Sequence, residues 1–257
     1  MTEHAAAERP QDFAGKVGIV TGATRGIGFG IAEELVTRGA RVVITARKPD
    51  ELAEATERLG GPQHALAARG SADDAEHQAA AIDQAIAAFG RLDILVNNAA
   101  INPLYGPVID ADLAAVRKTF EVNITATLAW AQLAHRAWMK EHGGGIVNVA
   151  SVGGIRVGAP IGIYNTSKAA LIHLTRVLAT ELGPVVRVNA IAPAVVKTQF
   201  ARALYERDEE GVASRYPMKR LGVPADCAAA AAFLLSDAAS WITGECLVVD
   251  GGVTLAG

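Results

Sequence analysis

The sequence predicts an α/β domain built on one doubly wound parallel sheet with helices on both faces. Short apolar runs rich in β-branched residues alternate with longer segments of helical spacing over nearly the whole chain. The runs are almost continuously apolar, which is typical of strands buried on both faces. Such strand–helix alternation indicates βαβ units with right-handed crossovers. The length of 257 residues fits one large domain.

Six apolar runs are the expected strands of this sheet. Each is four to six residues long and is followed by glycine, polar or helix-forming residues. They are Val17–Val20, Val42–Thr45, Leu92–Val96, Ile146–Val149, Val186–Ile191 and Cys246–Val249.

Five longer segments between these runs are the expected helices. Alanine and leucine, which favour helices, are frequent in them. They are Gly28–Arg38, Asp73–Phe89, Leu113–Lys140, Ser167–Leu182 and Asp226–Ser236.

Two segments do not fit the alternation of strands and helices. Residues 1–12 are polar and are expected to form a flexible lead-in to a single domain over residues 13–257. Residues 195–220 lack a strand signal and carry a cluster of charges at 206–210. This segment is expected to be a mobile substrate lid, and a pair of solvated surface helices is the alternative.

Composition excludes several classes of protein. The 24 Lys and Arg residues are balanced by 27 Asp and Glu, a formal net charge of −3, which argues against a nucleic-acid binder. The two cysteines have no metal-ligand spacing, so we expect neither a disulfide scaffold nor a metal site. No apolar run is long enough to span a bilayer, and residues 1–11 lack the apolar core of a signal peptide. We therefore expect a cytoplasmic protein with no membrane partner.

A glycine-rich turn directly follows the first expected strand and opens the first helix. Glycines allow the backbone to approach a pyrophosphate, whose charge the amides at a helix N-terminus stabilise. An ordinary glycine turn is the alternative, but the strand–turn–helix context favours a Rossmann-like nucleotide site. The expected contacts are Thr21, Gly22, Thr24, Arg25, Gly26, Ile27 and Gly28.

The spacing of this turn, Thr-Gly-x-x-x-Gly-x-Gly, resembles that of the short-chain dehydrogenase/reductase family. Asn97-Asn98-Ala99-Ala100 is similar to the family's Asn-Asn-Ala-Gly motif, and Pro193-Ala194 stands where Pro-Gly is usual. Val249–Gly252 resembles the family's C-terminal motif. The resemblance covers Phe13 to Gly252. Within the family, the chain resembles the 3-oxoacyl-carrier-protein reductase type. Related carbonyl, sugar-alcohol and steroid reductases share every one of these motifs.

Ser151, Tyr164 and Lys168 match the family's catalytic Ser…Tyr-x-x-x-Lys set. Tyr164 and Lys168 are four residues apart, so they share one face of a helix. We expect the lysine ammonium to lower the pKa of the phenol, which then exchanges a proton with a carbonyl or alcohol oxygen. The hydroxyl of Ser151 is expected to donate to the same oxygen. A snorkelling lysine on an amphipathic helix is the alternative to this catalytic role.

The resemblance implies further roles at the same site. Lys168 and Tyr164 would contact the nicotinamide ribose, and Asn123 would hold a water in a proton relay to Lys168. From the residues alone, Asn123 is a polar side chain within an apolar helix, so a packing or helix-bending role is the alternative. Other cofactor contacts are expected from Asn98, Ala99, Pro193, Val196 and Thr198.

Charge at the end of the second strand bears on the choice of cofactor. NAD-selective proteins usually place a carboxylate there for the ribose 2′-hydroxyl. This chain has Arg47 and Lys48 instead, with Arg25 nearby in the glycine turn, so no carboxylate is expected to repel a 2′-phosphate. We expect NADP(H), with NAD(H) as the alternative if Arg47 and Lys48 only solvate a strand end. No adenine-contacting aspartate can be assigned in Gly70–Asp74.

Together these residues predict an NADP(H)-dependent oxidoreductase. It would interconvert a small-molecule ketone, with a 3-oxoacyl thioester among the candidates, and a secondary alcohol by hydride transfer with tyrosine acid–base catalysis. The alternatives are an NAD(H)-dependent alcohol dehydrogenase of the same family and a non-catalytic nucleotide redox sensor. The intact Tyr164 and Lys168 pair favours an enzyme, since a sensor needs no proton transfer. The resemblance also implies a homotetramer, with a homodimer as the alternative.

Overall fold

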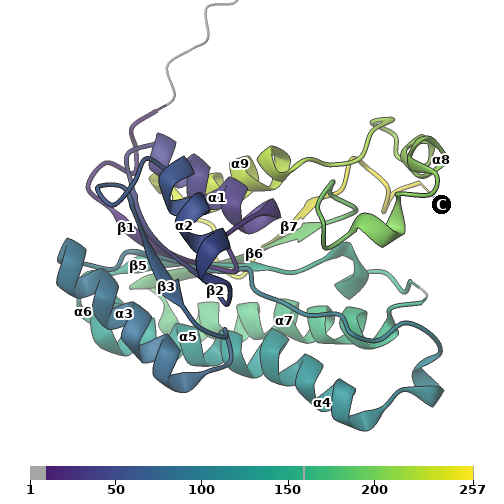
Figure 1. Ribbon diagram of the computed structural model, residues 1–257, viewed down its shortest axis with the longest axis horizontal. Coiled ribbons are helices and arrows are strands. Elements are labelled where there is room, and N and C mark those ends of the chain that lie inside the picture. The colour runs from purple at the N-terminus through teal and green to yellow at the C-terminus, as the bar shows by residue number, and fades with distance from the viewer. Residues whose placement is uncertain (1–9, 159, 257) are drawn as a thin grey trace, which may run out of the picture.

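The computed structural model describes residues 10–158 and 160–256 and contains a seven-stranded parallel sheet in the order β3-β2-β1-β4-β5-β6-β7 (Figure 1). The order of strands reverses at β1 and β4, where consecutive crossovers run to opposite sides of the starting strand. The strands are β1 Val17–Thr21, β2 Arg41–Ala46, β3 Ala65–Arg69, β4 Ile94–Asn97, β5 Gly144–Val149, β6 Val186–Pro193 and β7 Cys246–Val249.

All six expected strands are confirmed with small shifts in their bounds, but the sequence prediction missed one strand and one helix. The missed strand, β3, lies at the edge of the sheet, where only Ala65 and Ala68 of its five residues are buried. Its sequence, Ala-Leu-Ala-Ala-Arg, has no β-branched residue, so propensity gives no strand signal. The missed helix, α2 (Pro49–Arg58), connects β2 to β3.

The helices cover both faces of the sheet (Figure 1). On one face, α1, α2 and α9 share a core that includes Leu35, Leu52 and Leu234. On the other, the core of α3, α5 and α7 includes Ile82 and Trp130. The helix bounds are α1 Gly26–Thr37, α3 Ala75–Phe89, α4 Leu113–Phe120, α5 Ala126–Ala134, α6 Lys140–His142, α7 Gly162–Leu182, α8 Glu209–Ser214 and α9 Pro224–Leu235.

The helix expected over Leu113–Lys140 is continuous through His142 but contains two wide turns. The π-helical turns Glu121–Thr125 and His135–Met139 separate α4, α5 and α6. A π turn inserts a residue into the helix and is frequent at functional sites. The first of these turns contains Asn123.

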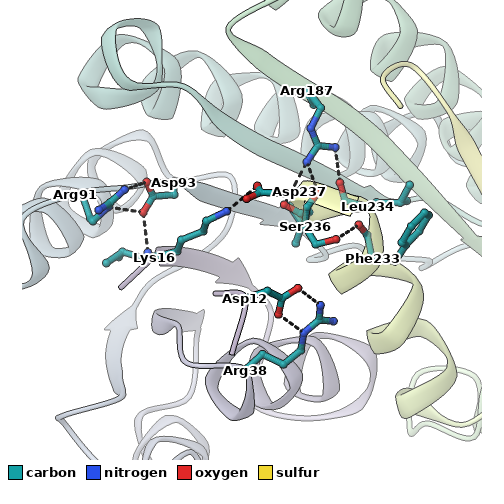
Figure 2. A network of polar contacts seen from close by, with 12 residues as sticks. Asp12, Lys16, Arg38, Arg91, Asp93, Arg187, Phe233, Leu234, Ser236 and Asp237 are labelled. Atoms are coloured by element: carbon teal, nitrogen blue, oxygen red, sulfur yellow. Dashed lines mark hydrogen bonds and ion pairs between the residues drawn. The ribbon is translucent and has the colours of Figure 1, made fainter. Parts of the chain in front are cut away.

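The amino ends of the strands are held by a network of charged side chains (Figure 2). Asp93 accepts a hydrogen bond from the amide of Val17 at 2.8 Å and forms an ion pair with Arg91. Arg187 donates to carbonyls at the end of α9, including those of Leu234 and Ser236. A guanidinium there satisfies carbonyls that the helix leaves without an internal partner. This end of the sheet is therefore closed by structural contacts, and the carboxyl ends of the strands remain for a site.

The predicted lead-in and the predicted lid both lie outside the alternation of strands and helices that forms the sheet. The predicted lead-in falls mostly outside the described residues, while Asp12 at its end forms an ion pair with Arg38. The predicted lid over residues 195–220 holds the short turn Arg202–Leu204 and helix α8.

Candidate active site and cofactor cavity

A cavity of about 860 Å³ runs along the carboxyl ends of the central strands. Residues that follow β1, β2, β4, β5 and β6 line it, together with the segment 198–204. In doubly wound sheets ligands bind at this edge, next to the strands where the order reverses. Most of the expected cofactor contacts line this cavity: Gly22, Thr24, Arg25, Gly26, Ile27, Arg47, Asn98, Ala99, Tyr164, Lys168, Pro193, Val196 and Thr198.

The glycine turn has a backbone conformation and close contacts that leave no room for larger side chains. Gly22 and Gly26 have φ values of +63° and +62°, in the left-handed region that favours glycine. A Cβ added at Gly28 would lie 2.4 Å from Nδ2 of Asn98 and 2.7 Å from the carbonyl oxygen of Gly22. Helix α1 begins at Gly26, so its first amides lie outside the helix's own hydrogen-bond ladder. This cradle fits the pyrophosphate of a dinucleotide.

Thr21 and Gly28, both expected to contact the cofactor, are not among the residues that line the cavity. Thr21 is buried, and its Oγ1 accepts hydrogen bonds from the amides of Asn98 and Ala99, both at 3.0 Å. Nδ2 of Asn98 in turn donates to the carbonyls of Thr21 and Gly22 at 2.8 and 2.9 Å. These contacts join the glycine turn to the end of β4, so Thr21 and Gly28 support the conformation of the turn without lining the cavity.

The expectation that no carboxylate stands near the end of β2 is wrong. Glu51, on α2, lines the cavity together with Arg25, Arg47 and Lys48. Its carboxylate accepts from Arg25 at 3.0 and 3.1 Å and from Lys48 at 2.7 Å. The hydrogen bond from Lys48 and the charge of Arg25 lower the pKa of Glu51. Glu51 is not part of the strand-end motif, because it lies on α2, a helix that the sequence pattern does not predict.

A second paired carboxylate lies on the wall of the cavity near the end of β3. Asp73 accepts hydrogen bonds from Ser71 and Lys118, and the bond from Lys118 is the main cause of its lowered pKa. All three residues line the cavity.

The structure brings Ser151, Tyr164 and Lys168 together in the cavity. Ser151 follows β5, and α7 begins at Gly162, five residues earlier than expected, so Tyr164 lies in its first turn. Tyr164 and Lys168 are buried, with 9% and 2% of their surface exposed, while Ser151 is partly exposed. Nζ of Lys168 lies 5.6 Å from the centroid of the Tyr164 ring and donates to the carbonyl of Val149 at 2.7 Å.

The pKa of Tyr164 differs in direction from the sequence expectation. Burial raises it to about 12, and a hydrogen bond with Ser151 opposes that rise. Burial also lowers the pKa of Lys168 to about 7. Lys168, whose own charge is disfavoured by burial, does not offset the rise in the pKa of the phenol. Near neutral pH the phenol therefore keeps its proton.

Asn123 does not line the cavity and connects two walls of the site instead. Its side chain accepts from the amide of Ile101 at 2.9 Å and donates to the carbonyl of Ile101 at 3.1 Å. Nδ2 also lies 2.9 Å from Oγ of Ser167, whose hydroxyl donates to the carbonyl of Tyr164 at 2.7 Å. These contacts agree with the packing alternative for the Asn123 side chain, and the water relay stays a prediction.

Side chains from the surrounding segments, including Phe200 of the predicted lid, also line the cavity. Phe200 lies with its ring centroid 6.0 Å from that of Tyr164. Tyr105 and Arg156 line the cavity from the loops after β4 and β5. No local motif marks these positions, since only the folded chain brings the loops together.

Neither a metal centre nor a membrane span is found in the described chain. Over residues 10–158 and 160–256, no three His, Cys, Asp or Glu side chains form a group that could hold a metal ion. No helix in that part of the chain is long and apolar enough to cross a membrane.

Comparisons with known proteins agree with the motifs. The family model described as enoyl-(acyl carrier protein) reductase matches residues 22–254. The chain is 38% identical over 249 residues to short-chain dehydrogenase/reductase SDRA of Arabidopsis thaliana, covering 95% of this chain and 96% of the relative. It is also 38% identical over 251 residues to dehydrogenase/reductase SDR family member 4 of Homo sapiens, covering 95% and 89%.

Two solved structures share the fold over almost their whole length. A short-chain type dehydrogenase/reductase from Mycobacterium ulcerans has a TM-score of 0.90 at 35% identity and covers 95% of this chain and 92% of its own. Aldohexose dehydrogenase (AldT) from Thermoplasma acidophilum has a TM-score of 0.86 at 30% identity, with 97% and 98% covered.

Proposed function

Because the chain belongs to the short-chain dehydrogenase/reductase family, we propose that it is an NADP(H)-dependent oxidoreductase that interconverts a ketone and a secondary alcohol. The observation that carries the proposal is the buried pair of Tyr164 and Lys168 with Ser151 beside it in the cavity. A phenol, a hydroxyl and an amine held in one cleft suit proton exchange with a substrate oxygen.

The roles of the three side chains follow from their surroundings. When bound, a reduced nicotinamide supplies the hydride to the carbonyl carbon. Tyr164 retains its proton near neutral pH, because burial raises its pKa, and it donates that proton to the carbonyl oxygen. Ser151 shares a hydrogen bond with Tyr164 and stabilises the negative charge that develops on the same oxygen. Lys168 would contact the ribose of the bound cofactor, and its ammonium would return a proton to the phenol.

Turnover of a ketone panel by a tyrosine variant tests this function. Wild-type protein should oxidise NADPH in the presence of simple ketones or an acetoacetyl thioester, measured by absorbance. Tyr164→Phe should bind the cofactor with similar affinity, followed by fluorescence, and lose at least about a hundredfold in turnover. A variant with wild-type turnover would show that Tyr164 is not the proton donor, and cofactor binding without any turnover by wild type would favour a redox sensor.

The preference for NADP(H) rests on cations at the end of β2. Arg25, Arg47 and Lys48 line the cavity, and guanidinium groups bind phosphate through paired donors. Glu51 favours the second candidate, an NAD(H)-dependent enzyme, because a carboxylate can accept the ribose 2′-hydroxyl and because it already pairs with Arg25 and Lys48.

Kinetics with the two cofactors separate these candidates. We expect a lower KM for NADPH than for NADH, and Arg47→Asp should raise the KM for NADPH by about tenfold or more while affecting NADH less. A clear preference of the wild type for NADH would overturn the assignment.

We further propose that the enzyme works as a cytoplasmic homotetramer. Trp241 is fully exposed and Phe233, on the neighbouring helix α9, is 40% exposed. Large exposed apolar side chains are typical of surfaces that pack against another chain. Light scattering of the purified protein measures the assembly, and the mass of a dimer or a monomer would contradict it.

A further inference from the structure

The cavity continues past the catalytic side chains between loops that contact one another. The amide of Gly106 donates to the carbonyl of Pro160 at 2.9 Å, so the loops after β4 and β5 lie side by side. Phe200 lines the cavity next to Tyr164. We call this region, formed by the cavity-lining residues within 101–105, 152–158, 161, 199–204 and 253–254, the substrate end. Most of its lining side chains are apolar: Ile101, Tyr105, Val152, Val157, Ile161, Phe200 and Leu204.

Arg156, an exposed residue that lines the cavity, places a positive charge at the edge of this mostly apolar region. Its amide donates to the carbonyl of Val152 at 2.8 Å, within the turn that starts at Ser151. One guanidinium nitrogen donates to the carbonyl of Val253 at 2.8 Å. The guanidinium is therefore held between the turn after β5 and the C-terminal segment, while its remaining N–H groups stay available.

The charge of Arg156 has no carboxylate partner within the described residues, and at the other end of the cavity the same holds for Arg47 but not for its neighbours. Arg25 and Lys48 pair with Glu51 there, as Lys118 does with Asp73.

The acid of the neighbouring C-terminal segment does not supply the missing partner. Both carboxylate oxygens of Asp250 accept hydrogen bonds from their own turn, from the amides of Gly252 and Thr254 and the hydroxyl of Thr254.

We propose that the substrate is a ketone that also carries a carboxylate, which Arg156 binds while Tyr164 and Ser151 bind the ketone oxygen. A carboxylate matches the paired N–H donors of a guanidinium, and such charge-assisted bonds are among the strongest in proteins. The apolar side chains of the substrate end would contact the carbon chain between the two groups. This inference rests on the proposed function and adds the class of substrate.

Matched acids and esters test the proposal. Acetoacetate and levulinate are compared with their methyl esters, which keep the ketone and lose the charge, and the two chain lengths test the spacing between ketone and carboxylate. Wild type should have the higher kcat/KM for at least one acid, mostly through KM. Arg156→Gln should lower the ratio of kcat/KM for acid over ester by about tenfold or more. The matched control is Arg136→Gln, since Arg136 is an exposed arginine that does not line the cavity, and it should keep the wild-type ratio.

Binding of pentanoate, which carries no ketone, separates this proposal from the proposed function. By calorimetry we expect pentanoate to bind wild type about tenfold or more tightly than Arg156→Gln, with Arg156→Lys between them. If no ketone turns over but pentanoate binding depends on Arg156, the proposed function fails and the carboxylate site stands. Equal binding to wild type and Arg156→Gln, or an unchanged acid-to-ester ratio while ketones turn over, would overturn the carboxylate site alone.

Discussion

Replacing Lys168 by methionine should make the protein more stable as well as inactive. Burial lowers the pKa of Lys168 from 10.5 to about 7. At 1.36 kcal/mol per pKa unit, this difference means that burying the charged lysine costs roughly 5 kcal/mol at pH 7. Methionine has a similar length and no charge. Loss of the hydrogen bond to the Val149 carbonyl costs about 1–3 kcal/mol, so the variant should gain roughly 2–4 kcal/mol in free energy of unfolding.

The stability difference between Lys168→Met and wild type should depend on pH. The pKa of Lys168 is lower in the folded protein than in the unfolded chain, so between about pH 7 and pH 10.5 the unfolded chain binds more protons. Over that range the contribution of Lys168 makes wild-type stability rise with pH. The advantage of Lys168→Met is therefore largest at or below about pH 7 and shrinks by roughly 1.4 kcal/mol for each pH unit above it.

Urea unfolding at about pH 7 and about pH 9, without added cofactor, measures both effects. Lys140→Met is the control, because the Lys140 side chain is 67% exposed and its replacement should change stability by no more than about 0.5 kcal/mol. Ketone turnover by Lys168→Met should fall at least about a hundredfold. The reasoning is refuted if Lys168→Met is less stable than wild type at pH 7, or if the stability difference is the same at both pH values.

Two further substitutions test the cofactor end of the cavity. Glu51→Gln should lower the KM for NADPH several-fold, because it removes a negative charge and frees Arg25 and Lys48. The KM for NADH should not fall. An equal change in the KM for both cofactors in steady-state kinetics would contradict this expectation. Gly28→Ala should destabilise the protein by about 1–3 kcal/mol and weaken cofactor binding, because the new Cβ would overlap Asn98 Nδ2 and the Gly22 carbonyl; wild-type thermal stability and affinity would show that the cradle can relax.

Most of the fold could be predicted from local patterns. The buried strands β1, β4, β5 and β6 are runs of apolar residues, and each was expected within a few residues of its observed bounds. Strand β3 could not be predicted because its alanine-rich residues form a strand only through pairing with β2.

The candidate site could be predicted where a motif places residues together. Tyr164 and Lys168 share a helix, and the glycine turn is one continuous segment, so spacing in the sequence corresponds to spacing in the cavity. Glu51 and Arg156 could not be assigned in this way. Glu51 bears on cofactor choice through its ion pair with Arg25, and Arg156 depends on its contact with Val253, at the other end of the chain.

The sequence by itself determined the fold class, the family and the candidate catalytic side chains, because hydrophobic periodicity and motif spacing are local properties of the chain. Only the tertiary structure shows the burial that raises the pKa of Tyr164 and lowers that of Lys168, since burial is set by everything packed around the two side chains. It also decided which charges in the cavity are paired. Burial and most ion pairs depend on residues that are distant in the chain, and they shift pKa values in ways that the spacing of a local motif does not predict.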